Sequence, residues 1–196
     1  MIFDFLALVE TEEQRDAINE LFLMHCEKMK TIAMSVLHNH ADAEDAMMNA
    51  FLYMCENASM FEDYKNPRVY GLILLKTRCA AIDLYRRNKR NAALLENLKE
   101  DVLLASQAAD EADLLDLLFS QENRRLFHEV LNSLEDDYRI PVSLKYFYEM
   151  RSNEIAAFMG ITESVVNVRI YRARKMLKEI CKERGYEYDG KEIQQL

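Results

Sequence analysis

The sequence predicts an all-α protein made of two small helical domains, the second with a C-terminal helix-turn-helix, joined by an acidic linker. Three observations predict this fold class. The 196 residues include only 4 Gly and 2 Pro, so few positions interrupt a helix. Apolar residues recur at intervals of three and four, and no segment alternates as a strand does. Half of the residues are hydrophobic, which is enough for packed cores.

Three helices are expected in the first domain. The first covers residues 13–37 and ends at the His-Asn-His segment that follows it. The second begins at Asp42, which we expect to cap it, because Asp accepts hydrogen bonds from the free N–H groups of a first turn. Residues 57–66 are expected to form a loop. The third helix covers residues 67–90 and begins with Asn-Pro, a cap followed by a first-turn proline.

The second domain is expected to begin with helices over residues 120–134 and 136–148, where Pro141 fits only a first turn. A helix-turn-helix follows over Ser152 to Leu177, with Ser152 as its first cap. Gly160 stands where the first helix must stop with a positive φ, and Thr162 caps the second helix. The tail after residue 184 is expected to fray.

The second helix of such a motif enters the major groove of DNA with its N-terminal end, where polar side chains meet base edges. Basic residues further along the helix grip phosphates. The residues expected to contact DNA are Thr162, Glu163, Ser164, Asn167, Arg169, Arg172, Arg174 and Lys175. An ordinary helical hairpin with an exposed basic face is the alternative, because basic residues suit the C-terminal half of any helix.

The net charge of −9 argues at first against nucleic acid as a partner, but the charges are segregated. Residues 61–95 carry 8 basic and 3 acidic residues, and residues 138–182 carry 9 and 4. Two separate basic blocks predict two contacts with a polyanion, although two solvated helix faces would give the same pattern. The expected boundaries are 1–92 for the first domain, 93–119 for the acidic linker, 120–184 for the second domain and 185–196 for the tail.

Three groups of motifs form a recognisable pattern. In the C-terminal part they are Glu154-Ile155-Ala156, Gly160-Ile161-Thr162 and Arg172-Ala173-Arg174-Lys175. In the N-terminal part they are Asp42-Ala43-Glu44-Asp45 with Phe51-Leu52, and Ile82-Asp83 with Arg86-Arg87. With these motifs the chain resembles the extracytoplasmic-function (ECF) type of sigma factors, in the sigma-70 superfamily. The first N-terminal motif resembles the family's polymerase-binding helix, and the second resembles its promoter-opening helix. The chain departs from the family where Met48-Asn49 replaces Gln-Glu, where Cys79 replaces Asn, and where Asn167-Val168 replaces Lys-Ser.

The resemblance implies a sigma factor that binds core RNA polymerase and directs promoter-specific transcription initiation. The residues implied for core polymerase are Asp42, Glu44, Asp45, Met48, Asn49 and Leu52. Those implied for promoter opening are Phe61, Tyr64, Tyr70, Arg78, Arg86, Arg87, Lys89 and Arg90, with the aromatic side chains as candidates to hold an unstacked base. The helix-turn-helix would read the minus-35 element of promoter DNA, and the linker would thread through the polymerase. An anti-sigma factor is a usual further partner in the family.

Three other classes of protein remain open on the residues alone. A stand-alone helix-turn-helix regulator with a helical sensing domain would bind DNA without polymerase, and a helical adaptor would bind only protein. An enzyme is disfavoured, because there is no Gly-rich phosphate loop, and no cofactor or metal is expected. The cysteines at 26, 55, 79 and 181 lack metal-ligand spacing. Without a signal peptide or an apolar span, the chain is expected to be cytoplasmic and not inserted in a membrane.

Overall fold

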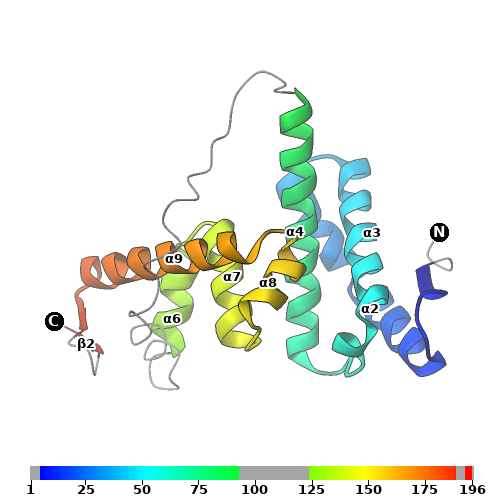
Figure 1. Cartoon of the computed structure of the whole chain (residues 1–196), viewed down its shortest axis with the longest axis horizontal. Coiled ribbons are helices and arrows are strands. Elements are labelled where there is room, and N and C mark those ends of the chain that lie inside the picture. Colours follow the sequence, from blue (N-terminus) through cyan, green and yellow to red (C-terminus); the bar gives the residue numbers. More distant parts are fainter. Residues whose placement is uncertain (1–4, 93–123, 189–192, 196) are drawn as a thin grey trace. The chain divides into compact units, whose positions relative to one another are not determined.

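The computed structural model describes residues 5–92, 124–188 and 193–195, and the predicted linker lies outside these ranges. The chain divides into two compact units, Met1–Leu98 and Lys99–Leu196. Helices account for nearly all of the regular structure in the described residues, which confirms the predicted all-α class. Figure 1 shows the order of the elements along the chain.

The first unit is built from three mutually packed helices: α2 (Glu12–Leu37), α3 (His40–Glu56) and α4 (Pro67–Ala92). Its core contains completely buried side chains from all three helices, among them Leu21, Phe51 and Ile73. The rings of Phe22 and Phe51 lie 4.7 Å apart and join α2 to α3. Burial of such large apolar side chains is the main favourable term that holds the three helices together.

The turn between α2 and α3 corrects the predicted cap of α3. His38 ends α2 in the left-handed region (φ 53°), and its N–H donates to the carbonyl of Met34. Asn39 then caps α3, because its Oδ1 accepts from the N–H groups of Ala41 and Asp42 at 2.9 and 3.4 Å. The cap of α3 therefore lies three residues earlier than predicted, and Asp42 lies within the first turn.

The connection from α3 to α4 contains a short 3₁₀ helix, η1 (Ala58–Phe61), within the predicted loop. Phe61 ends η1 and is completely buried, with its ring edge-on to Tyr53 of α3. The start of α4 agrees with the prediction, since Asn66 Oδ1 accepts from the N–H of Arg68 at 3.0 Å. The buried ring of Phe61 therefore fixes the path of the loop that leads to α4.

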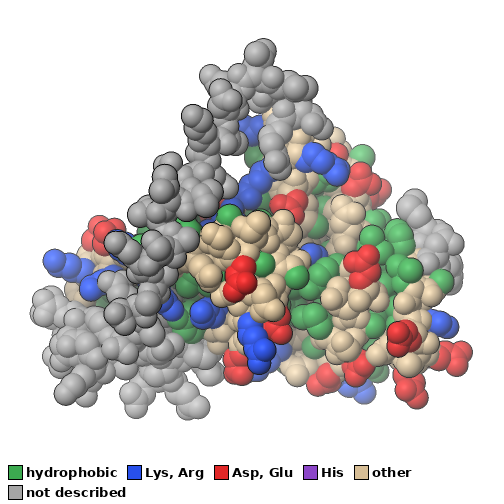
Figure 2. All heavy atoms as spheres, in the orientation of Figure 1, with side chains coloured by type: hydrophobic (Ala, Val, Ile, Leu, Met, Phe, Trp, Pro, Cys, Tyr) green, Lys and Arg blue, Asp and Glu red, His purple; other side chains and the backbone are tan. Residues whose placement is uncertain are grey.

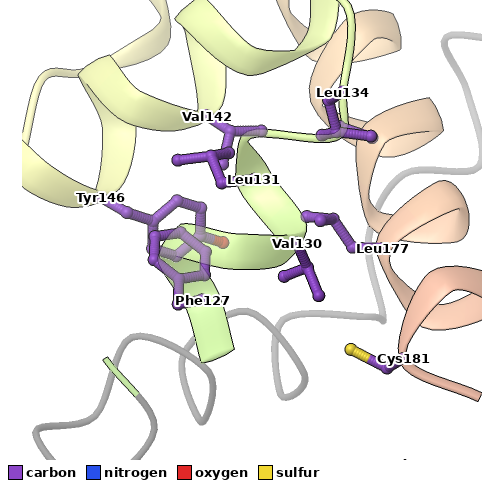
Figure 3. Close-up of a cluster of buried hydrophobic side chains, with 9 residues drawn as sticks. Phe127, Val130, Leu131, Leu134, Val142, Tyr146, Leu177 and Cys181 are labelled. Atoms are coloured by element: carbon purple, nitrogen blue, oxygen red, sulfur yellow. The ribbon is translucent and has the colours of Figure 1, made fainter. Parts of the chain in front are cut away.

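The second unit contains α6 (Arg124–Leu131), α7 (Asp136–Phe147), α8 (Ser152–Met159) and α9 (Glu163–Glu183). Its hydrophobic core joins α6, α7 and α9 through residues such as Phe127, Val142 and Leu177 (Figure 3). The helix expected to reach Leu134 ends at Leu131. Pro141 lies in the second turn of α7 and not in the first turn, where it was expected. Because proline has no N–H, it cannot donate to the carbonyl four residues earlier, so α7 lacks one backbone hydrogen bond.

Two further details of the second unit differ from the sequence prediction. Ser152 is the first residue of α8 and does not cap it; the carboxylate of Glu154 accepts instead from the backbone N–H of Arg151 at 2.6 Å. The tail, expected to fray, forms an antiparallel hairpin of β1 (Tyr186–Tyr188) and β2 (Ile193–Gln195). Tyr186 packs against the hydrophobic core, which gives the hairpin an anchor.

Candidate nucleic-acid and partner interfaces

The first candidate surface is the outward side of α3. The inner side of this helix is buried at Ala43, Ala46, Met47, Ala50 and Phe51. The six residues predicted from the sequence all avoid that inner side: Glu44, Asp45 and Asn49 are exposed, and Asp42, Met48 and Leu52 are half-buried. The structure thus brings carboxylates and apolar side chains together on one helix face, and Figure 2 shows hydrophobic side chains reaching the surface in this region.

Two of the three acids on this face have partners within the first unit. Asp42 Oδ2 accepts from the Nδ2 of Asn88 on α4 at 3.1 Å. Glu44 lies 3.4 Å from the ammonium of Lys30 on α2, in an ion pair that is open to solvent. Exposed pairs of this kind contribute little to folding, so both carboxylates can exchange partners at small cost.

The second candidate surface is on α4 and the loop before it. Arg87 and Lys89 are exposed, while Arg78 and Arg86 are half-buried, and the side chain of Arg90 lies outside the described residues. Basic side chains gather along this end of α4 in Figure 2. All four lie on one helix, and basic side chains of this kind can neutralise phosphates.

The three aromatic residues predicted for promoter opening have different surroundings. Phe61 is completely buried in the core, so it cannot stack on a base without opening the unit, and its prediction as a DNA contact does not fit this structure. Tyr64 is half-buried, with the Lys65 ammonium 5.5 Å from its ring centroid. Tyr70 is also half-buried, and its ring lies 4.3 Å from that of His25.

Lys76 was not selected from the sequence, and it lies between α3 and α4. Its Nζ is 3.8 Å from the ring centroid of Tyr53, a close cation–π contact. Burial lowers the pKa of this lysine, against smaller opposite effects of Cys79, Asp83 and Glu56. Lys76 therefore packs between the two helices, although its position in the sequence suggests one of the exposed basic residues of α4.

The third candidate surface is formed by α8 and α9, which have the predicted helix-turn-helix geometry. Gly160 ends α8 in the left-handed region (φ 68°), where a side chain is unfavourable. The Thr162 hydroxyl then accepts from the N–H of Val165 at 3.4 Å and caps α9. Along α9, Thr162, Glu163, Ser164 and Lys175 are exposed, and Asn167 and Arg172 are half-buried.

Two of the arginines predicted to face DNA contact side chains of α7. Arg169 is only 8 % exposed and forms an ion pair with Asp137, with 3.6 Å between Nη2 and Oδ2. Arg174 donates through Nη2 to the hydroxyl of Tyr146 at 3.1 Å. The prediction of Arg169 as an outward residue does not fit this structure, because position 169 lies on the buried side of α9 with positions 166, 170 and 173. Arg174 is half-buried, and its contact with DNA stays a prediction.

Tyr171 is a candidate residue that the sequence analysis missed. It is half-buried on α9, and the Lys175 ammonium lies 4.7 Å from its ring centroid. Asn167, Tyr171 and Lys175 follow one another at intervals of four, which places them on one helix face. That spacing is the signal in the sequence that identifies Tyr171.

The described residues contain no group of three or more His, Cys, Asp or Glu side chains placed to hold a metal ion. The four cysteines are free, and three of them are buried. In the ranges that the structure describes, every helix is too short or too polar to cross a membrane.

The two small helical units and the helix-turn-helix of the second define a DNA-binding protein, and comparison with known proteins specifies its kind. A family model described as sigma-70, region 4 matches residues 124–177. The chain is 26 % identical to the RNA polymerase sigma factor SigV of Bacillus subtilis over 79 % of its own length and 84 % of the relative's. It is 26 % identical to the ECF RNA polymerase sigma factor SigW of the same organism, over 84 % of its own length and 89 % of the relative's. It is 21 % identical to SigM, also an ECF RNA polymerase sigma factor of Bacillus subtilis, over 83 % of its own length and 94 % of the relative's.

The family model covers α6, α7, α8 and most of α9, and the relatives match 79–84 % of the chain. The comparisons support a relationship to the ECF sigma factors of the sigma-70 family.

Proposed function

We propose that this sigma factor binds core RNA polymerase through the outward face of α3 and brings it to promoter DNA through α4 and α9. The observation that carries the proposal is the α3 face, where Glu44 and Asp45 are exposed beside the half-buried Met48 and Leu52. Acids surrounding a small apolar patch suit a basic partner with an apolar centre, since the patch supplies affinity and the charges supply orientation. A methionine at its centre adapts to the partner's shape.

Promoter opening is assigned to α4 and the residues just before it. Arg87 and Lys89 are exposed on the basic end of the helix, where they can neutralise phosphates. Tyr64 and Tyr70 offer partly open rings on which an unstacked base can stack. Phe61 is assigned a structural role, because its buried ring supports the loop that carries Tyr64.

Recognition of the upstream promoter element is assigned to the outer face of α9. Glu163, Ser164 and Asn167 lie at its N-terminal end, which in this motif enters the major groove and meets base edges. Arg172 and Lys175 follow at positions suited to phosphates. Their number is small, and the chain carries a net charge of −9, so the free protein is expected to bind DNA weakly. Polymerase would supply the remaining affinity, and the site of action would be the cytoplasm.

The test mixes the purified full-length chain with bacterial core RNA polymerase, separates the complex by size exclusion, and assays it for run-off transcription from genomic fragments. Co-elution with new, discrete start sites is expected. Absence of co-elution together with tight DNA binding by the free chain would instead indicate a stand-alone regulator. Absence of both binding events would indicate an adaptor.

Variants of the α3 face make the test specific. Met48→Glu and Leu52→Glu are each expected to abolish co-elution, because each puts a charge into the apolar centre of the interface. Leu23→Glu is the matched control, since Leu23 lies on α2 and is already 64 % exposed. Thermal unfolding of all three variants should match that of the unmodified chain. If Leu23→Glu also abolished co-elution, the interface would lie elsewhere or extend over α2.

A further inference from the structure

The arginines of α9 divide into two groups with different surroundings. Arg169 and Arg174 each contact a side chain of α7, at Asp137 and Tyr146. Arg172 is half-buried, as Arg174 is, but within the described ranges no hydrogen bond or ion pair joins it to α7. The hydroxyl that Arg174 meets belongs to Tyr146, which is 8 % exposed and packs its ring against Phe127 (Figure 3). The half-buried Arg174 therefore meets a side chain that the core already holds in place.

The surroundings of Arg174 do not favour a role in stability. Its Nε is buried and, among the described residues, has no hydrogen-bond partner. A buried donor without a partner is unfavourable, and a buried charge is often replaced by apolar residues without loss of stability. The arginine can instead fix the orientation of α9, because its planar guanidinium donates to one hydroxyl at a defined position.

The ion pair between Arg169 and Asp137 lies at the other end of α7. Asp137 lies in the first turn of α7 and Tyr146 in its last, so Arg169 and Arg174 attach α9 near the two ends of the helix beneath it. Two separated attachments oppose both rolling of α9 about its own axis and swinging of α9 across α7. Rolling matters most for recognition, because a rotation of a few tens of degrees exchanges the side chains that face outward on a helix.

We propose that Arg174 and Tyr146, assisted by Arg169 and Asp137, are positioning residues that set the roll of α9 and thereby determine which of its side chains read the upstream promoter element. The proposal rests on the proposed function of α9. It predicts that Arg174 acts on DNA sequence preference through Tyr146 and makes no contact with phosphate.

The first test uses holoenzyme assembled from core polymerase and the full-length chain. The probes are a promoter fragment recovered by run-off transcription and the same fragment with its upstream element scrambled. Tyr146→Phe removes only the hydroxyl and is expected to reduce the preference for the intact fragment about ten-fold, the effect of one hydrogen bond to a charged group. Tyr138→Phe is the matched control, because Tyr138 lies on the same helix and packs on the same core. An unchanged preference in Tyr146→Phe would overturn the proposal.

Salt dependence separates positioning from a phosphate contact. Arg172→Met should lower the slope of log affinity against log salt by about 0.9, the value for one lost phosphate contact. Arg174→Met should leave the slope unchanged while reducing sequence preference, and in combination with Tyr146→Phe it should cause no further loss. A slope that falls in Arg174→Met, or additive losses in the double variant, would overturn the proposal.

Thermal unfolding of each free variant accompanies these assays, so that a loss of preference is compared at temperatures where every variant is folded. Failure of the unmodified chain to co-elute with polymerase would overturn the proposed function and this inference together. Normal transcription by the unmodified chain with unaltered preference in both Tyr146→Phe and Arg174→Met would overturn the inference alone.

Discussion

Asn88, near the end of α4, donates a hydrogen bond from Nδ2 to the Oδ2 of Asp42, in the first turn of α3, at 3.1 Å. The contact joins the helix assigned to promoter opening with the helix assigned to polymerase binding. Because Asp42 is also one of the acids on the α3 face, a basic group of a partner would compete with Asn88 for the same carboxylate. Under the proposed assignment of the α3 face, polymerase binding would therefore be linked to the position of the basic end of α4 through the side chain of Asp42.

Asn88→Ala should loosen the end of α4 without unfolding the first unit. Loss of one solvent-exposed hydrogen bond is expected to lower the free energy of unfolding by about 0.5–1 kcal/mol. Hydrogen exchange followed by mass spectrometry should show faster exchange in residues 82–90 and little change in α2. Asn49→Ala, at an exposed asparagine on α3, is the control. Equal exchange in both variants would mean that the Asn88 contact does not restrain α4.

Gly160→Ala should destabilise the second unit by about 1–2 kcal/mol, because an added Cβ is unfavourable at φ 68°. Gly160→Asn should cost less, since Asn tolerates the left-handed region better than Ala. Thermal unfolding of the full-length chain would measure both changes. An alanine variant as stable as the unmodified chain would show that the turn reaches another conformation.

Cys55 should make the stability of the first unit fall at alkaline pH. Burial raises the pKa of its thiol from 9.0 to about 11, with a smaller contribution from Glu56. The folded state thus holds the proton more tightly than the unfolded state. The resulting stabilisation is fully present below pH 9.0 and is lost as the pH rises through about 11, with a size of about 2–3 kcal/mol.

Urea unfolding under reducing conditions at a series of pH values would test this dependence. Cys55→Ala should be less stable at neutral pH, because it leaves a small cavity, but its stability should fall less steeply above pH 9.0. Cys26→Ala is the control, since Cys26 is only half-buried. Parallel curves for Cys55→Ala and the unmodified chain would remove Cys55 as the source of the effect.

The cysteines should also differ in their rates of alkylation. Cys26 is half-buried, whereas Cys55, Cys79 and Cys181 are buried, and burial raises the pKa of Cys181 as it does that of Cys55. The thiolate is the reactive form, so brief treatment of the folded chain with iodoacetamide should modify Cys26 first. Peptide mass spectrometry would identify the site. Early modification of Cys181 would indicate that the second unit opens on the timescale of labelling.

Much of the fold could be predicted from the sequence because its determinants are local. The start of α4 at Asn66-Pro67 and the turn at Gly160 depend on side chains next to the backbone groups that they satisfy. The cap of α3 was misplaced for a local reason too: Asn39 and Asp42 are both good caps, and the earlier one satisfies the first turn. The short hairpin after α9 escaped prediction because strands of three residues are too short to show an alternating pattern.

The candidate surfaces were less predictable, since a side chain's direction depends on what packs beneath its helix. Phe61 is an aromatic residue in a loop by sequence, and only the packing against Tyr53 shows that it is buried. Arg169 and Arg174 resemble Arg172 in every local respect. Their partners, Asp137 and Tyr146, lie about thirty residues away on a different helix. Periodicity describes the faces of one helix and therefore cannot reveal contacts between two helices.

The anchoring of Tyr186 has a practical consequence for handling the protein. The ring packs on the core formed by α6, α7 and α9, so Tyr186 covers part of the apolar surface of the second unit. A product shortened to the end of α9 would expose that apolar surface to solvent and tend to aggregate. Purification tags and fluorescent fusions on this protein therefore belong after the hairpin, so that Tyr186 is retained.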